Sequence, residues 1–167
     1  TEHIIHSNDW PEIYLAVCGL KYPANGFKDL AFLISEGFKE GDLSPEKFLI
    51  FFDNTKKAEH AIQWLQKQLP KSLQDKIKYF HSTMTQSYHE DEFQALKDSD
   101  TWGLCSTDAF GMGMDLPDIK LIIQWKATCD FCMLWQQFGQ EARQTGQTAV
   151  ALLLVKQKDT DDARKKK

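Results

Sequence analysis

Four sets of polar residues have the types and spacing to hold phosphate groups. Three of them directly follow apolar runs, and the fourth lies on a late helical segment. Hydroxyls, an amide and the N–H groups that begin a helix can bind phosphate oxygens without much net positive charge. Taken singly, the same side chains also serve as turn and helix N-cap residues. The sets are Asp53, Asn54 and Thr55; His81, Ser82 and Thr83; Ser106, Thr107 and Asp108 leading into Gly111, Gly113 and Asp115; and Gln136 with Arg143.

Two of these sets suggest nucleotide chemistry more directly. Gly111 and Gly113 let the backbone approach a ligand closely, and the Asp115 carboxylate can accept hydrogen bonds from ribose hydroxyls; the alternative is a glycine turn that requires positive φ. The Arg143 guanidinium could reach a phosphate that belongs to another lobe, as phosphoryl transfer requires. The alternative for Arg143 is a helix-end residue that complements the helix dipole.

The cysteines do not predict a metal site. Cys129 and Cys132 form a CxxC, but zinc needs four ligands, and Cys18 and Cys105 fall on predicted strands without ligand spacing. We therefore interpret Cys129 and Cys132 as paired buried thiols at a helix start, and we predict no metal site.

Composition limits the class of protein. The chain has 167 residues, 42% hydrophobic and 26% charged, which fits one globular domain with a substantial core. Its net charge of -4 argues against a free-standing non-specific DNA binder, so any nucleic-acid contacts must be local. The apolar runs are far shorter than the roughly 20 residues that cross a bilayer. We expect an intracellular protein without membrane contacts, nuclear in a eukaryote and otherwise cytoplasmic or nucleoid-associated.

Apolar runs alternate with segments of helical period, which predicts an α/β fold with a mostly parallel sheet covered by helices on both faces. At the start of the helix that ends near Lys97, Ser87 and Glu90 are spaced as a capping box. The predicted strands are Ile13–Val17, Phe48–Phe52, Ile77–Phe80, Trp102–Ser106, Ile119–Trp125 and Gln147–Val155. The predicted helices are Phe27–Ser35, a segment carrying Ala58, Ile62, Leu65 and Leu69, the helix ending near Lys97, and Asp130–Arg143.

Combined, these segments resemble the C-terminal lobe of the RecQ family of superfamily 2 DNA helicases. FLIFFDNTKKAEHAIQWL resembles helicase motif IV, IKYFHSTMTQSYHEDEFQAL the strand and His-containing turn that follow, and STDAFGMGMDLPDI motif V. WQQFGQEARQTG resembles motif VI, in which Gln136, Gly139 and Arg143 match and Gln140 replaces the first of two arginines. The resemblance covers about Phe48 to Val155 and extends more loosely from Ser7.

This resemblance implies a RecA-like lobe that closes over ATP and Mg²⁺ held mainly by a first, N-terminal lobe. Arg143 would be the arginine finger, with Gln136 beside it, and Gly111, Gly113, Asp115 and Gly139 would lie near the nucleotide. Single-stranded or partly duplex DNA would be tracked in the 3' to 5' direction. The implied DNA contacts are Asn54, Thr55, His81, Ser82, Ser106 and Thr107.

The sequence contains no G-x-x-x-x-G-K-[ST] phosphate loop and no DEAH-like box. We therefore expect an ATP-dependent helicase lobe that is inactive without its partner lobe. We divide the chain into an N-terminal strand, helix and linker (1–45), the lobe (46–156) and a charged tail (157–167). Two alternatives remain: a non-catalytic DNA- or protein-binding module, favoured by Gln140 and the acidic balance, and a DEAD-box-like RNA helicase lobe.

Overall fold

Strand β3, Phe48–Phe52, lies inside the sheet and is buried along its whole length. Its five apolar residues form a continuous run, which is typical of a strand covered on both faces. It pairs in parallel with β5 (Gly103–Thr107) on one side and β6 (Leu121–Trp125) on the other. The rest of the sheet is therefore built outward from β3.

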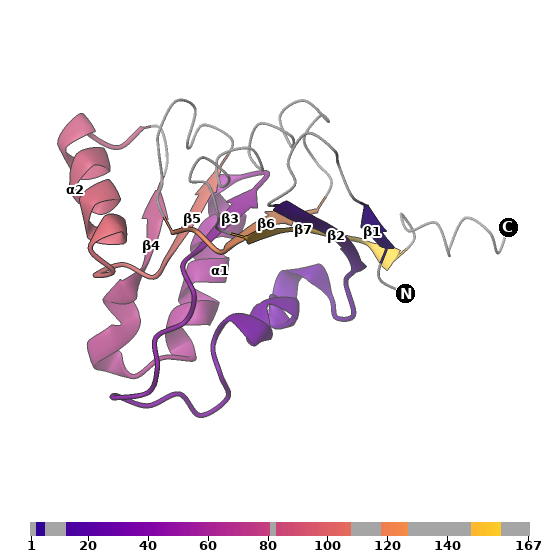
Figure 1. The fold of residues 1–167 in the computed structure, drawn as a ribbon, viewed down its shortest axis with the longest axis horizontal. Helices are drawn as coiled ribbons and strands as arrows, with labels where there is room; N and C mark the ends of the chain where they lie inside the picture. Colours follow the sequence, from indigo (N-terminus) through magenta and orange to yellow (C-terminus); the bar gives the residue numbers. More distant parts are fainter. Residues whose placement is uncertain (1–2, 6–12, 81–82, 108–117, 127–147, 158–167) are drawn as a thin grey trace, which may run out of the picture.

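The computed structural model describes residues 3–5, 13–80, 83–107, 118–126 and 148–157, and these form one open sheet. Its strand order is β1-β2-β7-β6-β3-β5-β4, and every neighbouring pair is parallel except β1 with β2 (Figure 1). The predicted α/β class with a mostly parallel sheet is confirmed. The strands outside the centre are β1 (His3–Ile5), β2 (Ile13–Gly19), β4 (Ile77–Phe80) and β7 (Ala149–Val155).

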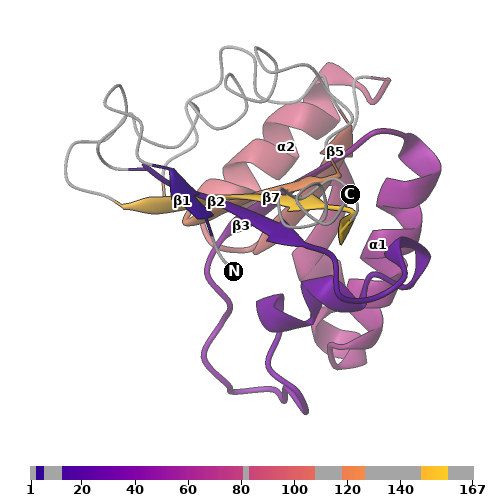
Figure 2. The same ribbon diagram turned by 90° about the vertical axis from the view of Figure 1, so that its right-hand side faces the viewer.

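Alternate residues of β3 enter two separate cores. Phe48, Ile50 and Phe52 pack with buried residues of α1 (Thr55–Lys67), whereas Leu49 and Phe51 pack with Leu96 of α2 (Gln86–Lys97). Figure 2 shows α1 and α2 on opposite sides of the sheet. This two-sided cover is what the continuous apolar run of β3 requires.

The sequence located six of the described strands, with bounds displaced by up to two residues. It missed β1, which has only three residues and pairs antiparallel at the sheet edge, because so short an edge strand carries no usable periodicity. β2 pairs with β7 over seven residues, so the N-terminal strand belongs to the same sheet as the rest of the lobe. No helix among the described residues is long and apolar enough to cross a membrane.

The predicted helix Phe27–Ser35 is wrong in type. Phe27 adopts a left-handed conformation with φ of 53°, which separates the 3-10 turn η1 (Ala24–Gly26) from the 3-10 helix η2 (Lys28–Leu33). The Phe27 ring is buried against Phe52 and Trp125, with ring centroids 6.2 and 5.4 Å away. Tertiary packing of this one aromatic ring therefore outweighs the local helical period.

Two further helix details differ from the sequence prediction. Ser87 lies inside α2, and the cap is Thr85, whose hydroxyl accepts a hydrogen bond from the Tyr88 N–H at 3.2 Å. The capping box of Ser87 and Glu90 is therefore wrong by two residues. α1 ends at Lys67, and a 3-10 helix, η3 (Lys71–Lys76), follows before β4. The predicted helix at 130–143 lies outside the described residues.

The close contact between β5 and β3 makes Gly103 sensitive to substitution. A Cβ at Gly103 would stand 2.1 Å from the Phe48 ring, whose side chain is fully buried. We expect Gly103→Ala to lower the free energy of unfolding by about 1–3 kcal/mol, because the core must shift to accept the methyl group. Urea denaturation followed by circular dichroism measures the change.

Gly26→Ala is the matched control, since its nearest neighbour would be the Lys28 side chain at 4.0 Å. Equal destabilisation by the two variants would contradict this packing of β5 on β3.

Candidate nucleic-acid interface

The carboxyl ends of β3, β5, β6 and β7 lie next to one another, because these strands are parallel and hydrogen-bonded in register. Phe52 is opposite Thr107 of β5, and Phe51 is opposite Gln124 of β6. In open α/β sheets, ligands bind at this edge. The residues that immediately follow these strands therefore share one surface. They are Asp53 and Asn54 after β3, Lys126 after β6 and Lys156 after β7.

Asn54 begins helix α1. Its backbone is extended, with φ of -153° and ψ of 160°, and its side-chain oxygen accepts a hydrogen bond from the Lys57 N–H at 2.9 Å. This is an N-cap arrangement, which satisfies one of the free donors of the first turn. Asn54 and Thr55 are exposed, so both can meet a ligand at the helix N-terminus. For Asn54, the cap role and a binding role are compatible because the cap uses only the side-chain oxygen, and the amide nitrogen has two N–H groups of which Asp53 accepts from one.

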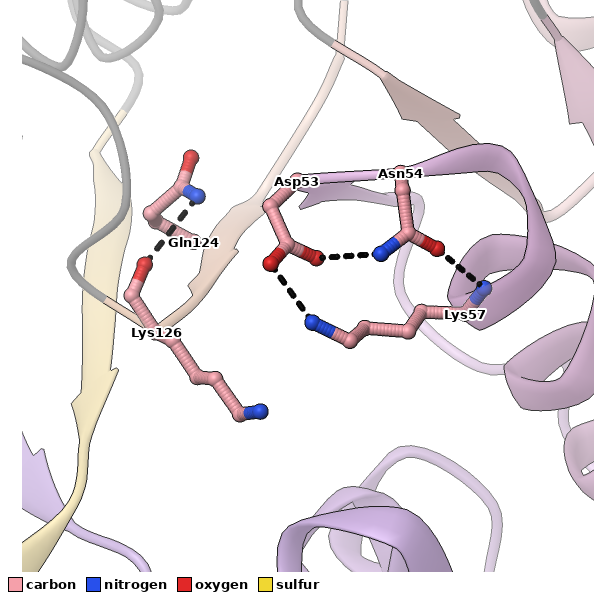
Figure 3. A network of polar contacts seen from close by, with 5 residues as sticks. All are labelled: Asp53, Asn54, Lys57, Gln124 and Lys126. Atoms are coloured by element: carbon pink, nitrogen blue, oxygen red, sulfur yellow. Dashed lines mark hydrogen bonds and ion pairs between the residues drawn. The ribbon is translucent and has the colours of Figure 1, made fainter.

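Asp53 and Lys57 form an ion pair beside this cap. The Lys57 Nζ lies 2.5 Å from the Asp53 carboxylate, and the Asn54 amide nitrogen lies 3.4 Å from the other carboxylate oxygen (Figure 3). Both side chains of the pair are only partly exposed, at 29% for Lys57 and 24% for Asp53. The ion pair fixes the Lys57 amine above the end of β3.

Lys126 is held in an unusual backbone conformation. Its φ is 70°, in the left-handed region that residues with a side chain rarely adopt. Its N–H donates to the Leu154 carbonyl at 2.8 Å. Its own carbonyl accepts from the Gln124 side-chain amide at 3.2 Å, as Figure 3 shows. Burial lowers the pKa of Lys126, and the nearby amines of Lys57 and Lys156 lower it further, while Asp53 partly offsets them.

A rigid aromatic group lies beneath these residues. Phe52 directly precedes Asp53, and Trp125 directly precedes Lys126; their rings are both fully buried, with centroids 6.2 Å apart. Because this packing fixes the ends of β3 and β6, it also fixes the backbone positions of the polar residues that follow them.

Of the predicted β5 contacts, Ser106 and Thr107 differ in exposure. Ser106 is 2% exposed, and its hydroxyl donates to the Thr107 carbonyl at 2.9 Å, so that hydroxyl is engaged inside the protein. Thr107 is half-buried at the strand end, so its side chain is the more accessible of the two to a ligand.

Within the described residues, no group of His, Cys, Asp and Glu could hold a metal ion. The other predicted site residues lie outside the described residues: His81, Ser82, Gly111, Gly113, Asp115, Gln136, Gly139 and Arg143.

Sequence reasoning overlooked Lys126 and Lys156. Both directly follow apolar runs, so the rule that selected Asn54 would also have selected them. Their convergence with Lys57, however, depends on the strand order β7-β6-β3, which the sequence does not reveal.

The fold matches that of the RecA-like C-terminal lobes of helicases. The chain superposes on the DEAD-box protein SrmB of E. coli, solved bound to the regulator of ribonuclease activity A, with a TM-score of 0.64 at 17% identity, covering 87% of this chain and 76% of that one. It also superposes on domain 2 of the DEAD-box helicase Mss116p, solved with an RNA duplex, with a TM-score of 0.65 at 23% identity, covering 87% and 55% of the two chains. The helicase MrfA, solved with DNA, gives a TM-score of 0.69 at 14% identity, covering 90% and 22%.

The helicase conserved C-terminal domain matches residues 30–145, more than half of the chain, and the chain belongs to this family. Among curated relatives, the pre-mRNA-splicing ATP-dependent RNA helicase PRP28 of Cryptococcus neoformans is 26% identical over 117 residues, covering 70% of this chain and 15% of the relative. The ATP-dependent RNA helicase DBP8 of Scheffersomyces stipitis is 27% identical over 113 residues, covering 68% and 24%. The chain thus spans less than a quarter of the length of these relatives.

The comparisons confirm the helicase part of the predicted resemblance. They do not support the RecQ assignment, because the relatives described above are RNA helicases. They agree better with the DEAD-box alternative, in which the same lobe belongs to an RNA helicase.

The Asn54 cap gives a direct test of how this edge is organised. We expect Asn54→Ala to reduce the free energy of unfolding by about 1 kcal/mol, because a donor of the first turn of α1 loses its partner. Asn54→Ser is the matched variant, since its hydroxyl can still accept that hydrogen bond. Thermal melts should rank wild type and Asn54→Ser above Asn54→Ala. If the alanine variant melts with the wild type, Asn54 does not fix the start of α1.

Proposed function

We propose that this chain is the second motor lobe of an ATP-dependent helicase, which binds the backbone of a nucleic-acid strand at the carboxyl edge of its sheet. The observation that carries the proposal is the exposed N-terminus of α1 beside the end of β5, in a lobe that belongs to the helicase C-terminal family. Helix N-terminal N–H groups and neutral polar side chains bind phosphate oxygens without a basic surface. This accounts for a nucleic-acid partner despite the net charge of -4.

In this proposal, the nucleic-acid strand is contacted by residues at or just after the carboxyl ends of β3, β4 and β5. Asn54, Thr55 and Thr107 are the described members of that set, and His81 and Ser82 would continue it. Ser106 would act indirectly, because its hydroxyl is bonded to the Thr107 carbonyl and so orients the end of β5. Such contacts position the backbone and carry no sequence information.

ATP hydrolysis would be shared with a first lobe. ATP and Mg²⁺ supply the phosphoryl chemistry, and the chain's lack of a phosphate loop and of a DEAH-like box is consistent with their being held mainly by the other lobe. Gly111, Gly113, Asp115 and Gly139 would line the nucleotide from this side. Arg143 would place its guanidinium against the transferred phosphoryl group, with Gln136 beside it.

RNA is the nucleic acid that the curated relatives favour, since PRP28 and DBP8 are both named as RNA helicases. DNA remains a second candidate because Phe110–Asp115, FGMGMD, resembles motif V of RecQ DNA helicases. Backbone contacts at this edge do not by themselves select the sugar, so the choice depends on recognition of the 2'-hydroxyl.

The proposal predicts activity that needs two lobes. The chain alone should not hydrolyse ATP, and a mixture with a phosphate-loop helicase lobe should hydrolyse ATP when single-stranded nucleic acid is added. Arg143→Ala should lower that rate by about 10³-fold or more, because the developing phosphoryl charge loses its clamp. Phosphate release is the measurement, with RNA and DNA strands of the same sequence compared as activators.

Arg143→Lys is the matched variant, because it keeps the positive charge but loses the planar fork, and it should remain strongly impaired. Greater activation by RNA supports the DEAD-box alternative, and greater activation by DNA supports the RecQ-like one. If the two lobes associate by sedimentation yet show no Arg143-dependent hydrolysis, the motor proposal fails. A non-catalytic binding module, consistent with Gln140 in place of the first motif VI arginine, would then explain the chain.

A further inference from the structure

Three lysines from separate elements converge at the ends of β3, β6 and β7. Lys57 lies in the first turn of α1, Lys126 directly follows β6, and Lys156 directly follows β7. The amines of Lys57 and Lys156 are both close enough to Lys126 to lower its pKa. Figure 3 shows the side chains of Lys57 and Lys126 extending into the same region from two sides. We name these three residues the lysine cluster.

Within the described residues, the lysine cluster carries more positive charge than nearby carboxylates neutralise. Asp53 is the acidic group that acts on Lys126, and its carboxylate is already paired with the Lys57 amine at 2.5 Å. Among the described residues, three amines and one carboxylate leave an excess of two positive charges at this place, in a chain whose net charge is -4. Like charges held close together repel one another, and Lys57 and Lys126 are only partly exposed, so the arrangement favours binding of an anion.

The backbone holds Lys126 in this position against that repulsion. Its left-handed conformation is a sparsely populated one, and such outliers persist where the surrounding structure fixes them, often at functional sites. Gln124 is fully buried, and its amide nitrogen donates to the Lys126 carbonyl, while its side-chain oxygen has no hydrogen-bond partner among the described residues. A buried polar atom without a hydrogen bond lowers the stability of the fold. The placement of Lys126 is therefore accompanied by backbone strain and by an unfavourable buried polar group.

We propose that the lysine cluster is a phosphate-binding site, in which the amines of Lys57, Lys126 and Lys156 surround one phosphate group and Asp53 holds Lys57 in position. The site lies beside the Asn54 and Thr107 contacts, across β6 and β7 rather than β5 and β4. That the phosphate belongs to a nucleic-acid backbone rests on the proposed function. The alternative source is the phosphate of a nucleotide, which offers the same oxygens.

The test uses the whole chain and two kinds of measurement. Nuclear magnetic resonance titration with inorganic phosphate should shift the Lys57, Lys126 and Lys156 resonances together. Binding of a single-stranded RNA oligonucleotide, measured by fluorescence anisotropy over a salt series, should weaken in Lys126→Gln, and the slope of log affinity against log salt should fall by about one. Titration with ADP, without oligonucleotide, distinguishes a nucleotide as the source of the phosphate.

Lys71→Gln is the matched control, because it removes the same charge from an exposed lysine at the start of η3, beyond the opposite end of α1. It should keep the wild-type slope. Circular dichroism melts show whether each variant is folded, and Lys57→Gln gives a second variant should Lys126→Gln unfold.

Each outcome has a distinct meaning. If the oligonucleotide binds but Lys126→Gln and Lys57→Gln both behave like Lys71→Gln, the lysine cluster is not a phosphate site, although the proposed function stands. If inorganic phosphate and ADP both shift the three lysines but no oligonucleotide binds, the site stands and its phosphate comes from a nucleotide. Absence of any shift together with an unchanged salt slope overturns the site outright.

Discussion

Burial of β3 on both faces is the constraint on which the rest of the structure depends. A strand without a solvent face needs hydrogen-bonded neighbours on both sides and cover above and below, and here the parallel strands β5 and β6 and the helices α1 and α2 supply these. Because the neighbouring strands run in the same direction, their carboxyl ends coincide. One packing requirement therefore creates the edge at which the polar residues meet.

That edge combines two ways of binding an anion. The start of α1 offers backbone N–H groups and neutral side chains, whereas the lysine cluster offers formal charge at the ends of the neighbouring strands. An acidic protein can bind nucleic acid in this manner because the attraction is local. The remaining acidic surface would oppose loose, non-specific association.

The sequence predicted those features that depend on neighbours along the chain. The run Phe48–Phe52 indicates a buried strand, and the spacing of Ala58, Ile62 and Leu65 indicates the helix that follows it. Prediction from the sequence failed where contacts between residues far apart in the chain determine the local structure. Phe27 breaks a helical period because its ring packs between Phe52 and Trp125, and β1 forms only because β2 offers an edge.

The candidate site likewise contains residues that could be predicted from the sequence and residues that could not. Asn54 was predictable because a cap is a local arrangement, whereas the convergence of Lys57, Lys126 and Lys156 depends on strand order. The choice between RecQ and DEAD-box relatives was not settled by motif wording, because the short FGMGMD segment favoured one family and the relatives of the whole lobe favour the other. The assignments at Arg143 and Asp115 stay predictions.

Hydrogen–deuterium exchange of the chain with and without single-stranded RNA tests most directly whether nucleic acid binds at this edge. The account predicts slower exchange in peptides that contain residues 53–57, 107, 126 and 156, at the carboxyl ends of four neighbouring strands. Protection confined to the opposite ends of these strands, around residues 45–47 and 99–102, would contradict it.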